Sequence, residues 1–166
     1  MSANHYRRLF EYNDWANHRV WECAASLSDE QFRRPCGYSI GSIHAQLVHQ
    51  MGVEWLFLQR TQGISPTSIP EADEYPTREA IRQQWDGIAS DWLPYLAYLN
   101  DDALDGSITF TSFNGKTQRT MPLWEILSQL LNHSTDHRAQ TLALIHQVGG
   151  KTLEQDFIFY AWENPL

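Results

Sequence analysis

The sequence is short of cysteine, of basic residues and of long apolar runs, and each shortage excludes a class of protein. Its two cysteines, Cys23 and Cys36, show no CxxC spacing, so they do not form a disulfide framework. Lysine and arginine number 12 against 20 aspartates and glutamates, and the resulting net charge of −8 repels nucleic acids. We therefore expect no nucleic-acid partner.

No apolar stretch approaches the length that crosses a membrane, and residues 1–8 lack the apolar core and cleavage site of a signal peptide. We therefore expect a cytoplasmic protein that does not bind membranes. The chain does contain the material for a core, because 42% of its residues are hydrophobic and 13% are aromatic. Residues 1–166 fit one domain, and no internal repeat is present.

Apolar residues recur at helical spacing in four segments. The first segment covers about residues 5–27, and the second runs from a cap at Ser39 or Ser42 to near Gly63. The third covers residues 77–99 and is expected to kink at Pro94. The fourth runs from near Thr120 to a stop at Gly149 and Gly150. The proline-rich residues 63–76 have no period and form a long connection that is expected to border a pocket.

A hairpin is predicted between the third and fourth helical segments. Asn114 and Gly115 form an Asn-Gly pair between the β-prone residues 107–113 and 116–120, and this is a strong hairpin signal. The predicted fold is therefore an all-α four-helix bundle with a short β-hairpin between its third and fourth helices.

Within the fourth segment, His133 and His137 are four residues apart, so they lie on one helix face with Cβ atoms about 6 Å apart. They continue the apolar line of Ile126, Leu130 and Leu144, which points both side chains inward. A metal ion uses the lone pairs of neutral imidazoles, whereas burial without a metal leaves their polar groups to be satisfied. The pair therefore predicts a metal site, although core or rim histidines bonded to side chains explain the same spacing.

The third ligand has to come from another helix, and His49 is the best candidate because it lies in mid-helix between Ala45 and Val53. Three neutral imidazoles suit zinc, nickel, copper or iron, and they leave one coordination position open for water or substrate. The remaining histidines lie near helix ends or among polar neighbours and are expected to be solvated: His5, His18, His44 and His146.

Two familiar metalloenzyme motifs are absent from the sequence. Ser134 stands where an HExxH protease needs its glutamate, and there is no paired ExxH motif of a di-iron bundle. Glu54 and Asp136 are the acids near the predicted ligands in sequence, and either is a hypothetical general base.

Three stretches in the first, second and fourth helical segments belong together: residues 12–17 (YNDWAN), 42–49 (SIHAQLVH) and 133–140 (HSTDHRAQ). On these stretches the chain resembles, over nearly its whole length, the DinB (DinB/YfiT-like) family of metal-binding four-helix bundles. The resemblance implies a divalent metal, most often zinc or nickel, held by His49, His133 and His137, and it implies a homodimer. It does not imply the DNA polymerase of the same name, because this acidic chain has no basic groove for DNA.

The wider superfamily is similar to enzymes that use low-molecular-weight thiols, including mycothiol-dependent maleylpyruvate isomerase and bacillithiol transferases. This similarity implies a metal-dependent transferase or hydrolase, in which the metal activates a thiol that attacks an electrophilic small molecule. The alternative is a metal-binding stress or accessory protein without turnover. A helical interaction module without metal would require the three histidines to be far apart. A fourth protein ligand would favour a structural role, and an exchangeable water would favour chemistry.

Three sets of residues have two interpretations each. A substrate pocket or core packing explains Trp15, Trp55 and Trp124. Orientation of the metal ligands or ordinary capping and surface roles explain Asn13, Asn17 and Arg138. A subunit interface or burial within the monomer explains Phe157, Phe159 and Trp162.

Overall fold

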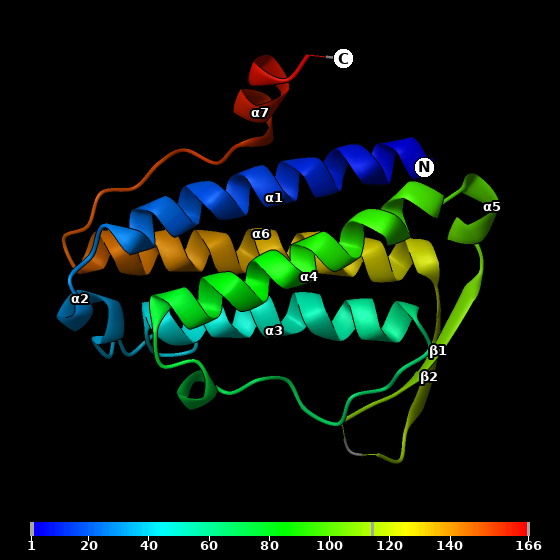
Figure 1. Ribbon diagram of the computed structural model, residues 1–166, viewed down its shortest axis with the longest axis horizontal. Coiled ribbons are helices and arrows are strands. Elements are labelled where there is room, and N and C mark those ends of the chain that lie inside the picture. The colour runs from blue at the N-terminus through cyan, green and yellow to red at the C-terminus, as the bar shows by residue number, and fades with distance from the viewer. Residues whose placement is uncertain (1, 114, 166) are drawn as a thin grey trace.

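The computed structural model describes residues 2–113 and 115–165, and four long helices dominate it (Figure 1). They are α1 (Ala3–Ala25), α3 (Ile43–Thr61), α4 (Arg78–Tyr98) and α6 (Leu123–Gln147). The shorter elements are α2 (Asp29–Arg33), η1 (Ala72–Glu74), α5 (Asp101–Leu104), β1 (Ser107–Thr111), β2 (Gln118–Pro122) and α7 (Phe157–Glu163). The predicted four-helix bundle with a hairpin before the last long helix is confirmed.

Side-chain caps decide where three of the long helices begin. Ser2, Ser42 and Thr77 each accept a hydrogen bond from the backbone N–H three residues further on. Of the two serines proposed for α3, the structure therefore selects Ser42. The predicted start of the last helix near Thr120 is wrong, because residues 118–122 pair with β1, and Pro122 takes the capping position of α6.

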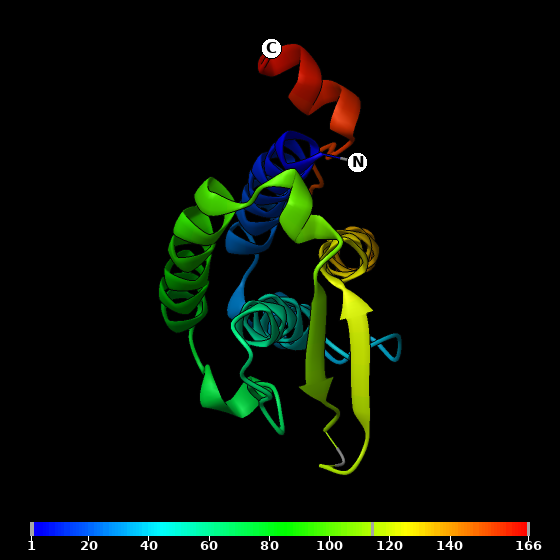
Figure 2. The same ribbon diagram turned by 90° about the vertical axis from the view of Figure 1, so that its right-hand side faces the viewer.

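The long helices surround a common core in a square arrangement when the bundle is viewed along its axis (Figure 2). Both α1 and α3 pack against α6 on one side and α4 on the other, so α1 and α3 occupy opposite corners. The apolar face of each helix is buried in this core, as Tyr6, Met51, Ile81 and Ile126 illustrate with at most 1% exposure. Apolar burial of this kind supplies most of the stability of such a bundle.

The hairpin lies at one end of the bundle, where β1 and β2 pair antiparallel with Ser107 opposite Pro122. Asn114 of the predicted turn lies outside the described residues. Gly115 adopts a φ of +68°, a left-handed conformation that favours glycine. The pairing register fixes the residue at which β2 ends and α6 begins.

The connection over residues 63–76 runs back along α3 and lies close to it at Gly52 (Figure 1). A Cβ atom at Gly52 would lie 3.0 Å from Cδ of Pro70 and 3.4 Å from Cβ of Ile69. This close approach needs glycine at position 52, three residues after His49, while the expectation that the connection borders a pocket stays a prediction. At the other end of the chain, α7 lies outside the bundle against α1 (Figure 2). No helix in the described part of the chain is long and apolar enough to span a membrane.

Candidate metal centre

Two adjacent helices bring the three predicted histidines together. His49 lies in the middle of α3, and His133 and His137 occupy successive turns in the middle of α6, which packs against α3. The ring centroids are 5.2 Å apart for His49 and His133, 4.7 Å for His49 and His137, and 4.2 Å for His133 and His137. All three side chains are partly buried. The structure thus unites one local pair with one residue that is 84 positions away.

The spacing of the nitrogen atoms fits a single small metal ion. One ligand atom from each histidine falls within a set whose members are all within 4.8 Å of one another. Nε2 of His49 and Nε2 of His133 are 3.3 Å apart. Two nitrogens bonded to one tetrahedral zinc at about 2.0–2.1 Å lie roughly 3.3 Å from each other, so this pair already has a suitable separation. Within residues 2–113 and 115–165, no fourth histidine, cysteine or carboxylate belongs to the cluster.

Burial keeps the cluster in the protonation state that binds metals. Burial, and to a smaller extent the nearby imidazoles, lower the pKa of both His49 and His133 from 6.5 to about 4. Burial also lowers the pKa of His137, although the carboxylate of Asp136 acts in the opposite direction. The three imidazoles are therefore neutral at physiological pH, and their lone pairs are available to a cation.

A buried glutamine orients one of the histidines, and sequence reasoning did not find it. Oε1 of Gln46 lies 2.8 Å from Nδ1 of His137, so Nδ1 carries the proton and Nε2 is left for a metal. The hydrogen bonds continue outward from Gln46, because its Nε2 donates to Oε1 of Gln140 at 3.0 Å and the Ser39 hydroxyl donates to the same oxygen. The signal was the position of Gln46, one turn before His49 on α3.

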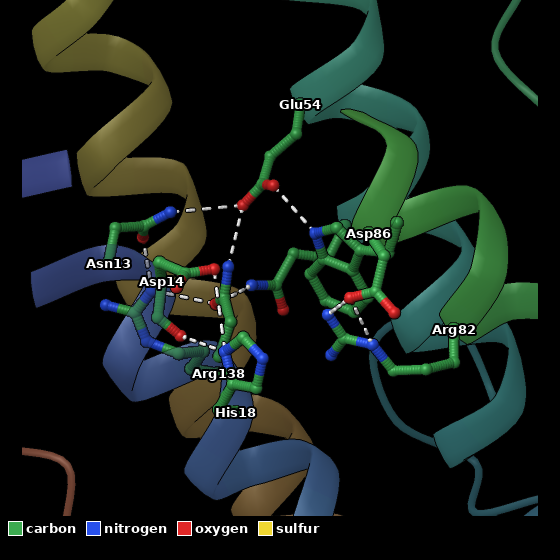
Figure 3. Close-up of polar contacts among 10 residues, drawn as sticks. Asn13, Asp14, His18, Glu54, Arg82, Asp86 and Arg138 are labelled. Carbon is green, nitrogen blue, oxygen red and sulfur yellow. Dashed lines mark hydrogen bonds and ion pairs between the residues drawn. The ribbon is translucent and has the colours of Figure 1, made fainter. Parts of the chain in front are cut away.

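The carboxylate of Glu54 organises the polar part of the core, as Figure 3 shows. Its Oε1 accepts hydrogen bonds from Asn13 Nδ2 at 3.1 Å, Asn17 Nδ2 at 2.9 Å and Ser134 Oγ at 3.3 Å, and its Oε2 accepts one from Trp85 Nε1 at 2.7 Å. Burial raises the pKa of Glu54, whereas these donors and the charge of Arg138 lower it. The hypothesis that Glu54 serves as a base is not supported, because its carboxylate is engaged by groups other than the histidines.

Arg138 completes this cluster from α6 and is fully buried. Its Nη1 donates to the side-chain oxygens of Asn13 and Asn17, whose amide nitrogens in turn donate to Glu54. The two asparagines thus bridge the opposite charges of Arg138 and Glu54. Ser134 and Arg138 directly follow the two histidines of α6 in sequence, so the cluster holds the same two helical turns that present the histidines.

The other residues singled out from the sequence are engaged in contacts away from the three histidines. Asp136 is exposed and accepts a hydrogen bond from Gln140. Trp15 donates to Glu163 at 3.0 Å and so fastens α7, while Trp55 and Trp124 pack against the core. The expectation that His44 is solvated is wrong, because it is 6% exposed and its Nε2 lies 2.7 Å from the carbonyl oxygen of Tyr75.

Fold and site together define a class of protein: a four-helix bundle with a cluster of three histidines between its second and fourth long helices. The sequence profile of the DinB family matches residues 1–165, and the chain belongs to the DinB family. No curated protein matches the chain in sequence. Among solved structures, a DinB-like protein from Bacillus cereus ATCC 10987 has the same fold, with a TM-score of 0.69 and 18% identity over 92% of this chain and 97% of that chain.

Proposed function

We propose that His49, His133 and His137 bind one divalent transition metal, zinc or nickel, and that the protein is a metal-dependent transferase or hydrolase. The observation that carries this proposal is the convergence of three imidazoles from two helices without a fourth ligand in the described part of the chain. Sites with three protein ligands keep a position for water or substrate, as catalytic metal sites do.

A metal bound there would stabilise the deprotonated form of a thiol or water at its open position. The chain's own residues prepare the site for this. Burial keeps the imidazoles of His49 and His133 neutral, and Gln46 fixes the ring of His137. The substrate class that we propose is a small electrophile attacked by a low-molecular-weight thiol.

The experiment is to measure the metal content of untagged protein by elemental mass spectrometry. We expect about one zinc or nickel per chain in the wild type, because the three ligands form one site. The content should fall to background in His49→Ala and in His133→Ala. His146→Ala is the matched control, since His146 is an exposed histidine on α6, and it should retain the metal. Wild-type protein that stays metal-free after zinc or nickel is offered would overturn the proposal.

The second candidate function is a metal-binding stress or accessory protein without turnover. Its support is the buried cluster around Glu54 and Arg138, which ties α1, α3 and α6 together behind the histidines. The two candidate functions differ in whether the open coordination position of the metal exchanges its water for an added thiol. A water ligand that exchanges with added thiols, seen as a change in the absorption spectrum of cobalt-substituted protein, favours the enzyme. A spectrum that thiols leave unchanged favours the accessory protein.

We also propose that the protein is a cytoplasmic homodimer. Support comes from α7, on which Phe157 is 41%, Ile158 48% and Trp162 68% exposed, because large exposed apolar side chains on one short helix are typical of an interface. Phe159 is half-buried and meets Trp162 edge to face with ring centroids 5.6 Å apart. Light scattering of the wild type and of Trp162→Ser tests this, and a monomeric wild type would contradict it. The net charge of −8 continues to argue against nucleic acid.

A further inference from the structure

A groove with a volume of about 530 Å³ lies between α1 and α4, and none of the three histidines lines it. This volume is within the range of small-molecule sites in proteins. Arg7 closes the groove at one end by donating to the backbone carbonyl oxygens of Leu96, Ala97 and Leu99, so α1 and α4 are tied together there. The groove is therefore a feature of the packed bundle, and it is separate from the metal centre.

The walls of the groove are apolar, and its floor is the carboxyl group of Glu54. Phe10 and Trp92 pack with their ring centroids 4.9 Å apart, and Leu93 and Leu96 continue the same wall along α4. Glu54 reaches into the space between α1 and α4 from α3 (Figure 3) and is 5% exposed. A ligand in this groove thus meets aromatic rings and a carboxylate that is almost entirely removed from water.

The charges that line the groove favour a cation. Besides Glu54, the acids Glu11, Asp14 and Asp86 line it, and the bases that line it are Arg7 and His18. The donors of Arg7 are directed to the backbone carbonyl oxygens named above and to the side-chain oxygen of Asn4. Asp86 is paired with Arg82, and Nδ1 of His18 lies 3.5 Å from Oδ1 of Asp14.

Two polar groups at the groove have spare hydrogen-bonding capacity. Oε2 of Glu54 accepts one bond, from Trp85, and a carboxylate oxygen can accept more. The indole Nε1 of Trp92 is buried and has no hydrogen-bond partner in the part of the chain that the structure describes. A cation that carries only donors cannot accept this N–H, so the indole of Trp92 reports on the groove without bonding to such a ligand.

We propose that this groove binds a small organic cation, namely a primary ammonium group carried on a short aryl or alkyl chain. The ammonium group lies against the carboxylate of Glu54, and the apolar part lies against Phe10 and Trp92, where the aromatic faces also attract the positive charge. A neutral analogue keeps the apolar contacts and loses the charge interaction. An anionic analogue meets repulsion from Glu54 and Asp14.

Three probes of one shape separate these cases: 3-phenylpropylamine, 3-phenylpropanol and 3-phenylpropionate. The readout is the indole N–H signal of Trp92 in a proton–nitrogen correlation spectrum of the full-length protein, assigned with Trp92→Phe. We expect the amine to shift this signal saturably with a Kd in roughly the millimolar range, given the size of the probe. The alcohol should bind at least about fivefold more weakly, and the carboxylate should not bind. Equal or tighter binding of the carboxylate, or no binding of the amine, overturns the proposal.

Variants locate the site. Ala89 and Ser90 line the groove on α4, so Ala89→Phe and, independently, Ser90→Phe should abolish the shift by filling it. Gln83→Phe adds the same bulk at an exposed position of α4 outside the groove and should leave binding unchanged. Asp14→Asn should weaken the amine roughly two- to fivefold. Amine binding that both filling variants leave intact places the ligand elsewhere and refutes the proposal. His49→Ala should bind the amine normally, so failure of the metal site and failure of this site are distinguishable.

Discussion

Replacing Glu54 by glutamine tests whether one carboxylate holds the polar core together. The carboxylate accepts four hydrogen bonds from donors on α1, α4 and α6. A glutamine keeps one carbonyl oxygen, and its amide NH₂ group has to face either the indole N–H of Trp85 or the side-chain amides of Asn13 and Asn17. Both orientations place a donor against a donor, because every neighbouring group is a donor.

The size of the effect follows from these contacts. With the carbonyl toward α1, the indole N–H of Trp85 loses its acceptor, and an unsatisfied buried donor costs about 1–3 kcal/mol. Arg138 also loses its opposite charge. Breaking a buried pair costs about 3–5 kcal/mol, but burial already raises the pKa of Glu54, so removing its charge recovers part of that cost. We expect a loss of about 2–4 kcal/mol in the free energy of unfolding, which lowers Tm by roughly 4–16 °C.

The assay is urea unfolding followed by circular dichroism in the presence of a chelator, which removes any contribution from bound metal. Glu22→Gln, at an exposed position of α1, is the control and should stay within about 0.5 kcal/mol of the wild type. Because Trp85→Phe removes the opposing donor, the double variant with Glu54→Gln should be more stable than the sum of the single changes by about 1–2 kcal/mol. The role given to Glu54 would be refuted if Glu54→Gln were as stable as the wild type, or if the coupling energy between Glu54→Gln and Trp85→Phe were near zero.

Other predictions concern the metal centre and its surroundings. Gln46→Leu removes the partner of Nδ1 of His137 and should weaken zinc binding about 10-fold or more in a chelator competition; unchanged affinity would show that the ring is held without it. In metal-free protein, the pKa of His49 and His133 is lowered to about 4 from the 6.5 of the free side chain, so between these values the unfolded chain binds protons that the folded chain does not. The free energy of unfolding should therefore fall as the pH decreases through this window, and replacing both histidines by glutamine should flatten this part of the profile in urea titrations; an unaltered slope would contradict the shifted values. Gly52→Val places side-chain atoms where a proline already lies 3.0 Å from the Cβ position, and it should lower stability by about 1–3 kcal/mol in thermal unfolding; an unchanged Tm would show that the connection yields without cost.

Local patterns of the sequence account for the helices, the hairpin and the ligand pair of α6. Helical periodicity and caps depend on neighbours within a few residues, which is why the four long helices could be predicted. The spacing of His133 and His137 places both on one face of any helix. The start of α6 was predicted too early because residues 118–122 take part in strand pairing, and a strand partner is a non-local influence on the chain.

His49 was predicted from its mid-helix position between Ala45 and Val53, and the family resemblance implied the same residue, although no local pattern links it to α6. Only the packing of α3 against α6 shows that His49 lies within reach of the other two histidines. The same holds for Glu54, whose partners on α1, α4 and α6 are 31 to 80 residues away, and for Gln46, 91 residues from His137. The sequence by itself thus determined the helices and the chemical type of the site. The tertiary structure decided which polar side chains support it, because side chains buried between helices are selected by packing partners that are distant along the chain.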